Sequence, residues 1–395
     1  MKKKDETPHS IREMDSRAQR NVRILELLRR KGPISRTDIS KASGINPVTV
    51  SQYIDKLIEL DLVYEKAYDV SSGGRRPLLL DITDGTAYTL GIGINLFGCH
   101  GVLTDLDGKI IEKVSHTCAV KEPGAILLQV VEVADALLSA KPEYQLRLKG
   151  LGVGLGGIID EEKGVVRWPS SEGEPSYASV SMPLKGFLED RYGCDVFLAN
   201  DADMACFAEH WYSFDQNVRN IVYMYSGVSC GLLLGGELYR GKNWCAGELF
   251  VRSLDESHTG LGNVSFLHAW RHDLGLLSRT NGLLAQAGEA RRCANIDDVF
   301  AENVDGVVAA LDDAAHALGA KIAFLVNTLN PDAVVIGGGF ERGGRLFIDA
   351  VSGYARKYAM EEMSRSLHIV PTGIGDLGVA MGAAAMMTKN VFANV

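Results

Sequence analysis

The segment PVTVSQYIDKLI at residues 47–58 has the pattern of an amphipathic helix. Pro47 suits the first helical position, where no backbone N–H is required. Val50, Ile54 and Leu57 recur at helical spacing and predict a buried face. The opposite face carries short polar or basic side chains, namely Thr49, Ser51, Gln52 and Lys56. Such side chains can bond to phosphates and base edges, so the segment is the expected recognition helix of a DNA-binding motif.

Two further helices are predicted before this segment. Residues 16–31 carry an apolar stripe and are followed by Gly32-Pro33, which ends a helix. Residues 36–42 form a second, shorter helix, and the turn after it contains Gly44, which suits a left-handed conformation. Three helices at this spacing predict a helix-turn-helix.

A β-wing is predicted after the third helix. Residues 62–66 and 78–82 read as two short strands around the glycine-rich tip SSGGRRP at residues 71–77. The tip carries Arg75 and Arg76, and arginine at such a position can enter a minor groove, where the potential is most negative. The head is therefore predicted to be a winged helix-turn-helix.

We expect this head to bind double-stranded operator DNA. The recognition helix would lie in the major groove and the wing in the adjacent minor groove. The predicted contact residues are Arg36, Asn46, Thr49, Ser51, Gln52, Lys56, Arg75 and Arg76. The alternative is a three-helix interaction module whose basic residues only face solvent.

Charge separates this head from the rest of the chain. The 395 residues carry a formal net charge of −9, which on average disfavours nucleic-acid binding. Residues 1–82, however, hold 16 Lys+Arg and 12 Asp+Glu, a net of +4, which leaves 25 basic and 38 acidic residues, a net of −13, for the remainder. We therefore assign residues 1–15 to a flexible tail and residues 16–82 to the DNA-binding domain.

The body, after residue 85, repeats one order of predicted elements. The first unit has strands at 87–94, 101–105 and 110–117, a helix at 125–139 and a strand at 150–154. The second has strands at 221–225, 230–234 and 237–239, a helix at 305–328 and a strand at 333–336. Two β-β-β-α-β units in series predict an α/β fold of two lobes with a cleft between them.

The head, the wing and several motifs of the body together resemble the ROK family of repressors, open reading frames and sugar kinases. The body motifs are Asn200-Asp201-Ala202, Ala246-Gly247-Glu248, Asn330-Pro331-Asp332 and Gly337-Gly338-Gly339. The resemblance implies an actin/hexokinase-like (ribonuclease H-like) body, with one lobe at 86–200 and 370–395 and the other at 201–369. It also implies a sugar pocket between the lobes and a homodimer or higher homo-oligomer.

The phosphate-binding motifs of the family's kinases are altered here. Those kinases open the body with Asp-x-Gly-x-Thr, and the corresponding stretch places Gly93 at the acid and Phe97 at the hydroxyl. Their second phosphate loop has a middle glycine where this chain has Ser229. Phosphoryl transfer needs both a metal-organising acid and an open phosphate cradle. We therefore expect no kinase activity and no cofactor.

The sugar-binding motifs are better preserved. Asn200-Asp201 matches the family's motif, in which the aspartate is the catalytic base of kinases. Without ATP, Asp201 would accept hydrogen bonds from sugar hydroxyls, and Asn200 and Glu248 would add further bonds. The loop at 154–157 resembles the family's Gly-x-Pro-Gly loop near the sugar. The predicted sugar-binding residues are Gly157, Asn200, Asp201 and Glu248.

The family's structural zinc site is not preserved. Val251 stands where the family has histidine, and residues 246–292 contain no cysteine. Because tetrahedral zinc sites of this kind need thiolate and imidazole ligands, we expect no bound metal.

These features together predict a cytoplasmic transcriptional regulator of carbohydrate metabolism, most simply a repressor, that senses a sugar or sugar derivative. No apolar run reaches the length of a membrane span, and no apolar segment of a signal peptide follows the N-terminal lysines. Two alternatives remain open. One is an ATP-dependent sugar kinase with an accessory DNA-binding head, and the other is a regulator controlled by a protein partner, with a degenerate sugar site.

Overall fold

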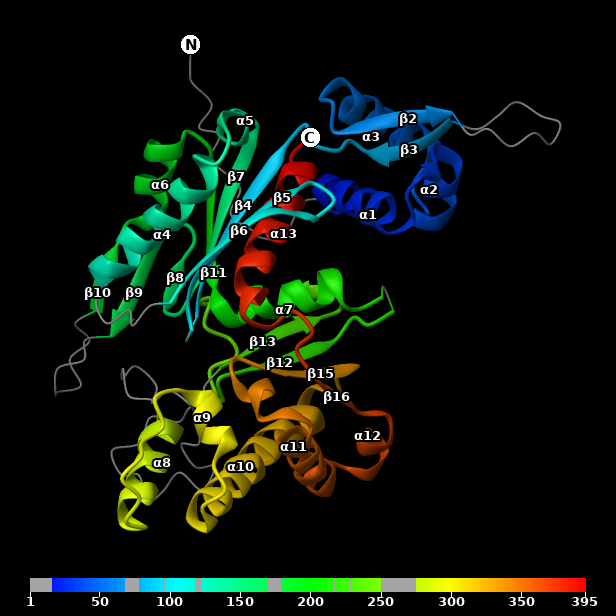
Figure 1. The fold of residues 1–395 in the computed structure, drawn as a ribbon. Helices are drawn as coiled ribbons and strands as arrows, with labels where there is room; N and C mark the ends of the chain where they lie inside the picture. Colours follow the sequence, from blue (N-terminus) through cyan, green and yellow to red (C-terminus); the bar gives the residue numbers. More distant parts are fainter. Residues whose placement is uncertain are drawn as a thin grey trace.

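The computed structural model describes residues 16–67, 78–95, 97–117, 123–169, 179–215, 217–227, 229–249 and 275–395. The predicted tail at 1–15, the wing arginines Arg75 and Arg76, and Val251 lie outside these residues. The described chain forms a small head and two larger lobes, each built on a β-sheet (Figure 1).

The head is a winged helix-turn-helix, as predicted. Its elements are α1 (Ser16–Lys31), β1 (Ile34–Ser35), α2 (Arg36–Ser43), α3 (Pro47–Glu59), β2 (Val63–Ala67) and β3 (Leu78–Ile82). The three strands form one antiparallel sheet in the order β1-β3-β2. Local signals set the helix ends: Ser35 accepts a hydrogen bond from the N–H of Asp38, and Gly44 ends α2 with a φ of +68°.

The first lobe is a five-stranded sheet in the order β11-β7-β4-β5-β6. Its strands are β4 (Tyr88–Asn95), β5 (Gly98–Asp105), β6 (Ile110–His116), β7 (Leu148–Leu155) and β11 (Asp195–Asn200). One face is covered by α4 (Pro123–Leu138) and α6 (Leu184–Tyr192), whose apolar residues share a core with the strands. The lobe also contains α5 (Pro142–Leu146) and a small sheet of β8 (Ile158–Asp160), β9 (Val165–Pro169) and β10 (Ser179–Met182).

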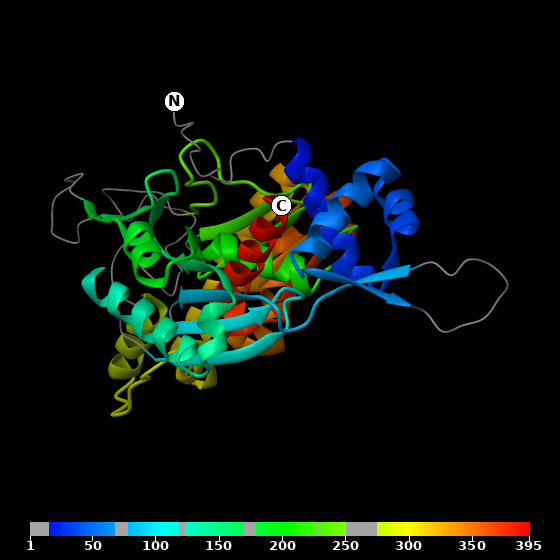
Figure 2. The same cartoon turned by 90° about the horizontal axis from the view of Figure 1, so that it is seen from above.

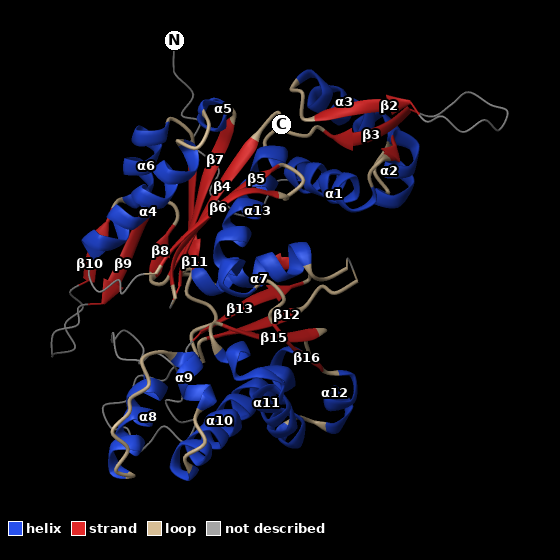
Figure 3. Cartoon of the chain, in the orientation of Figure 1, coloured by secondary structure: helices blue, strands red, loops and turns tan. Residues whose placement is uncertain are grey.

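The second lobe has a five-stranded sheet in the order β14-β13-β12-β15-β16. The strands are β12 (Ile221–Tyr225), β13 (Ser229–Leu234), β14 (Glu237–Leu238), β15 (Ala333–Gly337) and β16 (His368–Pro371). The helices are α8 (Gly275–Gln286), α9 (Ile296–Ala301), α10 (Asp305–Leu329), α11 (Gly344–Tyr358) and α12 (Glu361–Ser366), with short turns η2 (Phe340–Gly343) and η3 (Gly375–Leu377). Figure 3 shows these sheets and helices as separate layers. The two predicted units are confirmed, and each sheet gains a parallel edge strand, β11 or β16, that was not predicted.

Two helices, α7 (Asp201–Tyr212) and α13 (Gly378–Ala393), pack between the two sheets. α13 lies close against β4 because the strand has glycine on the facing side. A Cβ on Gly91 would stand 2.0 Å from the carbonyl oxygen of Ala380. This close approach requires glycine, and it brings α13 within reach of the head.

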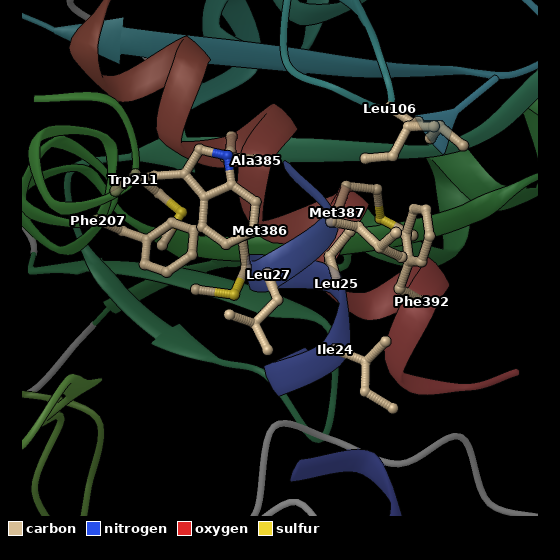
Figure 4. Packing of buried hydrophobic residues seen from close by; sticks show 14 of the residues in the cluster. Ile24, Leu25, Leu27, Leu106, Phe207, Trp211, Ala385, Met386, Met387 and Phe392 are labelled. Carbon is tan, nitrogen blue, oxygen red and sulfur yellow. The ribbon is translucent and has the colours of Figure 1, made fainter. Parts of the chain in front are cut away.

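The head shares one hydrophobic core with the body. Figure 4 shows Ile24, Leu25 and Leu27 of α1 facing two sets of body side chains. These are Phe207 and Trp211 of α7, and Met386, Met387 and Phe392 of α13. A hydrogen bond adds to the same contact: the Tyr53 hydroxyl donates to the carbonyl of Phe392 at 2.8 Å. The head projects to one side of the body (Figure 2), yet it is joined to it by buried side chains.

Candidate functional site

The predicted recognition helix α3 has the two faces that its sequence indicates. Val50, Ile54 and Leu57 are fully buried in the head. The predicted DNA-contact side chains lie on the other side, with Asn46, Gln52 and Lys56 exposed and Thr49 and Ser51 partly buried. The face is thus open to a ligand and mainly polar.

Arg36, another predicted DNA contact, is engaged within the head. Its guanidinium donates to Asp55 of α3 at 2.6 Å and to Glu65 of β2 at 2.8 Å. These two ion pairs tie α2 to α3 and to the wing strand. A role for Arg36 in binding phosphate stays a prediction, and its ion pairs give it a bracing role in the head.

Val48 lies on the same face of α3, although it was not among the predicted DNA-contact residues. Its side chain is 64% exposed, although it lies on the recognition helix. Its position could have been predicted, because Val48 does not share the helical spacing of the buried residues Val50, Ile54 and Leu57. Its neighbour Asn46 caps the helix by accepting a hydrogen bond from the N–H of Val48 at 2.8 Å.

The predicted sugar-binding residues of the first lobe come together at the start of α7. Asn200 is the N-cap of this helix, and its Oδ1 accepts a hydrogen bond from the N–H of Ala202 at 2.9 Å. The Nδ2 of Asn200 donates to the carbonyl of Gly157 at 3.4 Å. Asp201 is the first residue of α7, next to this pair. Burial raises the pKa of its carboxyl to about 6.

Glu248 reaches the same region from the second lobe. It forms a bridge to Ser229 at the start of β13, and Cys230 donates its N–H to the carbonyl of Gly247 at 2.7 Å. Glu248 keeps part of its surface in solvent, while burial of the rest, with the charges of Asp201 and Asp203, raises the pKa of its carboxyl to about 7. The predicted sugar-binding residues of the two lobes therefore lie near one another and offer several hydrogen-bond acceptors.

A buried ion cluster, which the sequence reasoning also missed, lies beside this site. Arg240, which follows β14, donates to Glu161 in the turn after β8 at 2.6 Å, and its Nε lies 3.5 Å from an oxygen of Asp203 in α7. All three side chains are at most 7% exposed. Burial raises the pKa of Glu161 to about 7 and that of Asp203 to about 6. The cluster links the two lobes, and no sequence motif marks it.

Phe97, the residue at the hydroxyl position of the kinase motif, packs against a cation. The guanidinium carbon of Arg342 lies 3.8 Å from the centre of the Phe97 ring. Arg342 also donates to both carboxylate oxygens of Asp376, at 2.8 and 2.9 Å, and to Asp297 at 2.7 Å. A small pocket beside this pair is lined by Asn95, Phe97, Ala205, Tyr223, Tyr225, Gly338, Glu341, Gly375, Asp376 and Val379. Arg342, the cation that contacts Phe97 at this pocket, is paired with two carboxylates, so its charge is largely compensated.

Neither a metal cluster nor a membrane span is found in the described ranges. Among these residues, no group of three or more His, Cys, Asp or Glu side chains is arranged to hold a metal ion. Their helices are also all too short or too polar to cross a bilayer.

Comparisons with known proteins agree with this architecture. A model described as the ROK family matches residues 89–390, and a model described as winged helix-turn-helix DNA-binding matches residues 18–64. The xylose repressor of Caldicellulosiruptor bescii is 26% identical over 373 residues, which cover 91% of this chain and 92% of that protein. The DNA-binding transcriptional dual regulator NagC of Escherichia coli is 24% identical over 388 residues, which cover 93% of this chain and 91% of that protein.

Solved structures show the same fold. A ROK family transcriptional regulator, described as a homolog of the E. coli MLC protein, matches with a TM-score of 0.73 and 20% identity over 95% of this chain and 97% of that chain. A ROK family glucokinase from Streptomyces griseus, in complex with glucose and AMPPNP, matches with a TM-score of 0.59 and 18% identity. The glucokinase match covers 76% of this chain and 99% of that chain.

Proposed function

The chain belongs to the ROK family, and from this premise we propose that it is a DNA-binding transcriptional repressor of carbohydrate metabolism whose sugar effector binds between the two lobes. The observation that carries the proposal is the path of α7. This helix begins at Asp201 in the candidate sugar site and ends against the DNA-binding head. A helix of 12 residues is about 18 Å long, so one rigid element joins the two functions.

On the DNA side, α3 would lie in the major groove of an operator. Asn46, Thr49, Ser51, Gln52 and Lys56 would face bases and phosphates, and Arg75 and Arg76 of the wing would enter the minor groove. A homodimer would place two heads on a palindromic operator, with half-sites one or more helical turns apart. Such a repressor would act in the cytoplasm.

On the sugar side, Gly157, Asn200, Asp201 and Glu248 would bind hydroxyl groups. Glu248 belongs to the second lobe, whereas Gly157, Asn200 and Asp201 lie where the first lobe meets α7. One bound sugar would therefore hold both lobes at a fixed separation. Sugar binding can change operator affinity only if the two lobe arrangements bind sugar with different affinity. The shared core of α1, α7 and α13 would carry that difference to the head.

We propose that the protein is not a kinase. The kinase motif would need an acid at Gly93 and a hydroxyl at Phe97, and Phe97 instead packs against Arg342, which is paired with Asp376 and Asp297. The names of the repressor relatives support this proposal. ATP-dependent phosphorylation of a common hexose, pentose or N-acetyl sugar by the purified chain would contradict it.

The test is selection of bound DNA from a random pool by the full chain, with and without D-xylose, D-glucose or N-acetylglucosamine. We expect a palindromic sequence to be enriched, and at least one sugar to weaken its binding tenfold or more. Asp201→Asn should abolish that sugar response while leaving DNA binding intact, and Asp190→Asn, an exposed change on α6, serves as the matched control. If no DNA is enriched, the proposed function is wrong. If DNA binds but no sugar has an effect, the regulator controlled by a protein partner is favoured.

A further inference from the structure

The recognition helix exposes one apolar side chain on its DNA-facing side. Val48 is 64% exposed, whereas Val50, Ile54 and Leu57 of the same helix are fully buried. A single exposed valine is ordinary on a protein surface, so exposure alone does not indicate a function. Val48 lies in the first turn of α3, the part of a recognition helix that comes nearest to base edges.

The orientation of Val48 is fixed away from the body. Tyr53 of the same helix bonds to Phe392 of α13, and five residues correspond to about 140° around a helix. Val48 therefore points to the opposite side, where Gln52 follows one turn later and is also exposed. The cap by Asn46 and the proline at the first helical position hold this turn in place.

The two side chains together match one chemical pattern in the major groove. The thymine 5-methyl group is the apolar feature of that groove, and glutamine can bond to both N6 and N7 of adenine. Positions four residues apart are separated by about 6 Å along the helix. Two base-pair steps, at about 3.4 Å each, span a similar distance along DNA. A β-branched valine also loses little side-chain freedom on contact, because its χ1 is already restricted.

We propose that Val48 and Gln52 form a specificity pair that reads an A·T-containing step of each half-site, Val48 by contact with a thymine methyl and Gln52 by bonds to an adenine. The inference rests on the proposed function, since it requires an operator. It goes beyond that function because it states which base each side chain contacts, and because it gives the exposed valine one partner, the thymine methyl group.

The experiment uses the full chain and the operator enriched from the random pool. Each thymine of the half-site is replaced in turn by uracil, which lacks only the 5-methyl group. We expect one uracil position to weaken binding about fourfold, the value for removing one buried methyl group from an apolar contact. V48A should bind the thymine operator more weakly by a similar factor and should no longer distinguish uracil from thymine at that position.

Gln52 is tested in the same way with 7-deazaadenine, which lacks the N7 acceptor. The wild-type chain should lose affinity at one adenine within two base pairs of the uracil-sensitive thymine, and Q52A should not. V308A, a change at another exposed valine, on α10 of the second lobe, is the matched control and should bind all operators as the wild type does.

Three outcomes separate the possibilities. Equal binding of thymine and uracil operators by the wild type at every position overturns the inference while leaving DNA binding intact. Equal sensitivity of the wild type and V48A to uracil also overturns it, because another residue then contacts the methyl group. Failure to enrich any DNA refutes the proposed function itself, and the inference with it.

Discussion

Arg29 of α1 stacks on the indole of Trp211, with the guanidinium carbon 4.2 Å from the ring centre, and donates a hydrogen bond to the carbonyl of the same residue at 2.6 Å. Its neighbour Arg30 donates to the carbonyl of Phe214 at 2.7 Å. Arg29 thus satisfies a backbone carbonyl of the last turn of α7, and Arg30 also donates to the carbonyl of His210 in that turn at 3.2 Å, where a helix leaves its carbonyls unpaired. A cation there also suits the negative end of the helix dipole.

Removing this contact should loosen the head. We expect R29A to lower the free energy of unfolding by about 2 kcal/mol, from the loss of a charged hydrogen bond and a cation–π contact. Exposed Arg23 on the same helix provides the control, R23A, which should change stability by less than about 0.5 kcal/mol. Urea unfolding measures both. A value for R29A equal to that of R23A would show that α7 and the head are not energetically joined through this residue.

Restoring the acid of the kinase motif should damage the fold rather than create activity. A Cβ on Gly93 would lie 2.5 Å from the backbone nitrogen of Ala380 and 2.8 Å from the Cβ of Val379. We therefore expect G93D to lose about 3 kcal/mol of stability or more and to show no ATP turnover. In contrast, G186A on α6 has open space around the new Cβ and should be neutral or stabilising by up to about 1 kcal/mol. A stable G93D chain would mean that α13 can move away from β4.

The carboxylates of Asp201 and Glu248 should make stability depend on pH. The pKa of Asp201 is raised to about 6 and that of Glu248 to about 7, above their ordinary values of 3.8 and 4.5. Because the folded state then binds protons more tightly than the unfolded state, these groups favour folding at low pH, and this contribution is lost as the pH rises from about 4 to about 7. The variant D201N/E248Q should show a smaller fall in unfolding free energy between pH 5 and pH 7.5. Parallel curves for the two proteins would contradict the assignment.

The ion cluster between the lobes should show strong coupling. R240M leaves Glu161 and Asp203 buried without their cation, and we expect a loss of about 3 to 5 kcal/mol. Adding E161Q and D203N removes the uncompensated charge and should recover most of that loss. Unfolding of the wild type, R240M, the double variant E161Q/D203N and the triple variant gives the coupling energy. Additive effects would mean that the three groups do not act as one cluster.

Local signals in the sequence were sufficient for the head and for the order of elements in the body. The period of Val50, Ile54 and Leu57 placed the buried face of α3, and Gly44 marked the end of α2. These features depend on residues only a few positions apart in the chain, so the sequence pattern is enough to predict them. The Asn200-Asp201 motif was predicted only as part of a sugar site, and the structure adds that Asn200 caps α7.

Local patterns therefore account for the winged helix and the two repeated units, and they indicate the residues of the candidate sugar site. The contacts of Arg29 with Trp211, of Arg240 with Glu161 and of Arg36 with Asp55 and Glu65 are visible only in the folded chain. Arg29 and Trp211 are 182 residues apart, and Arg240 and Glu161 are 79 apart. No local pattern links such residues, because their contact depends on how the two sheets and α13 pack against one another. The same packing places α7 between the candidate sugar site, where it begins, and the DNA-binding head, against which it ends.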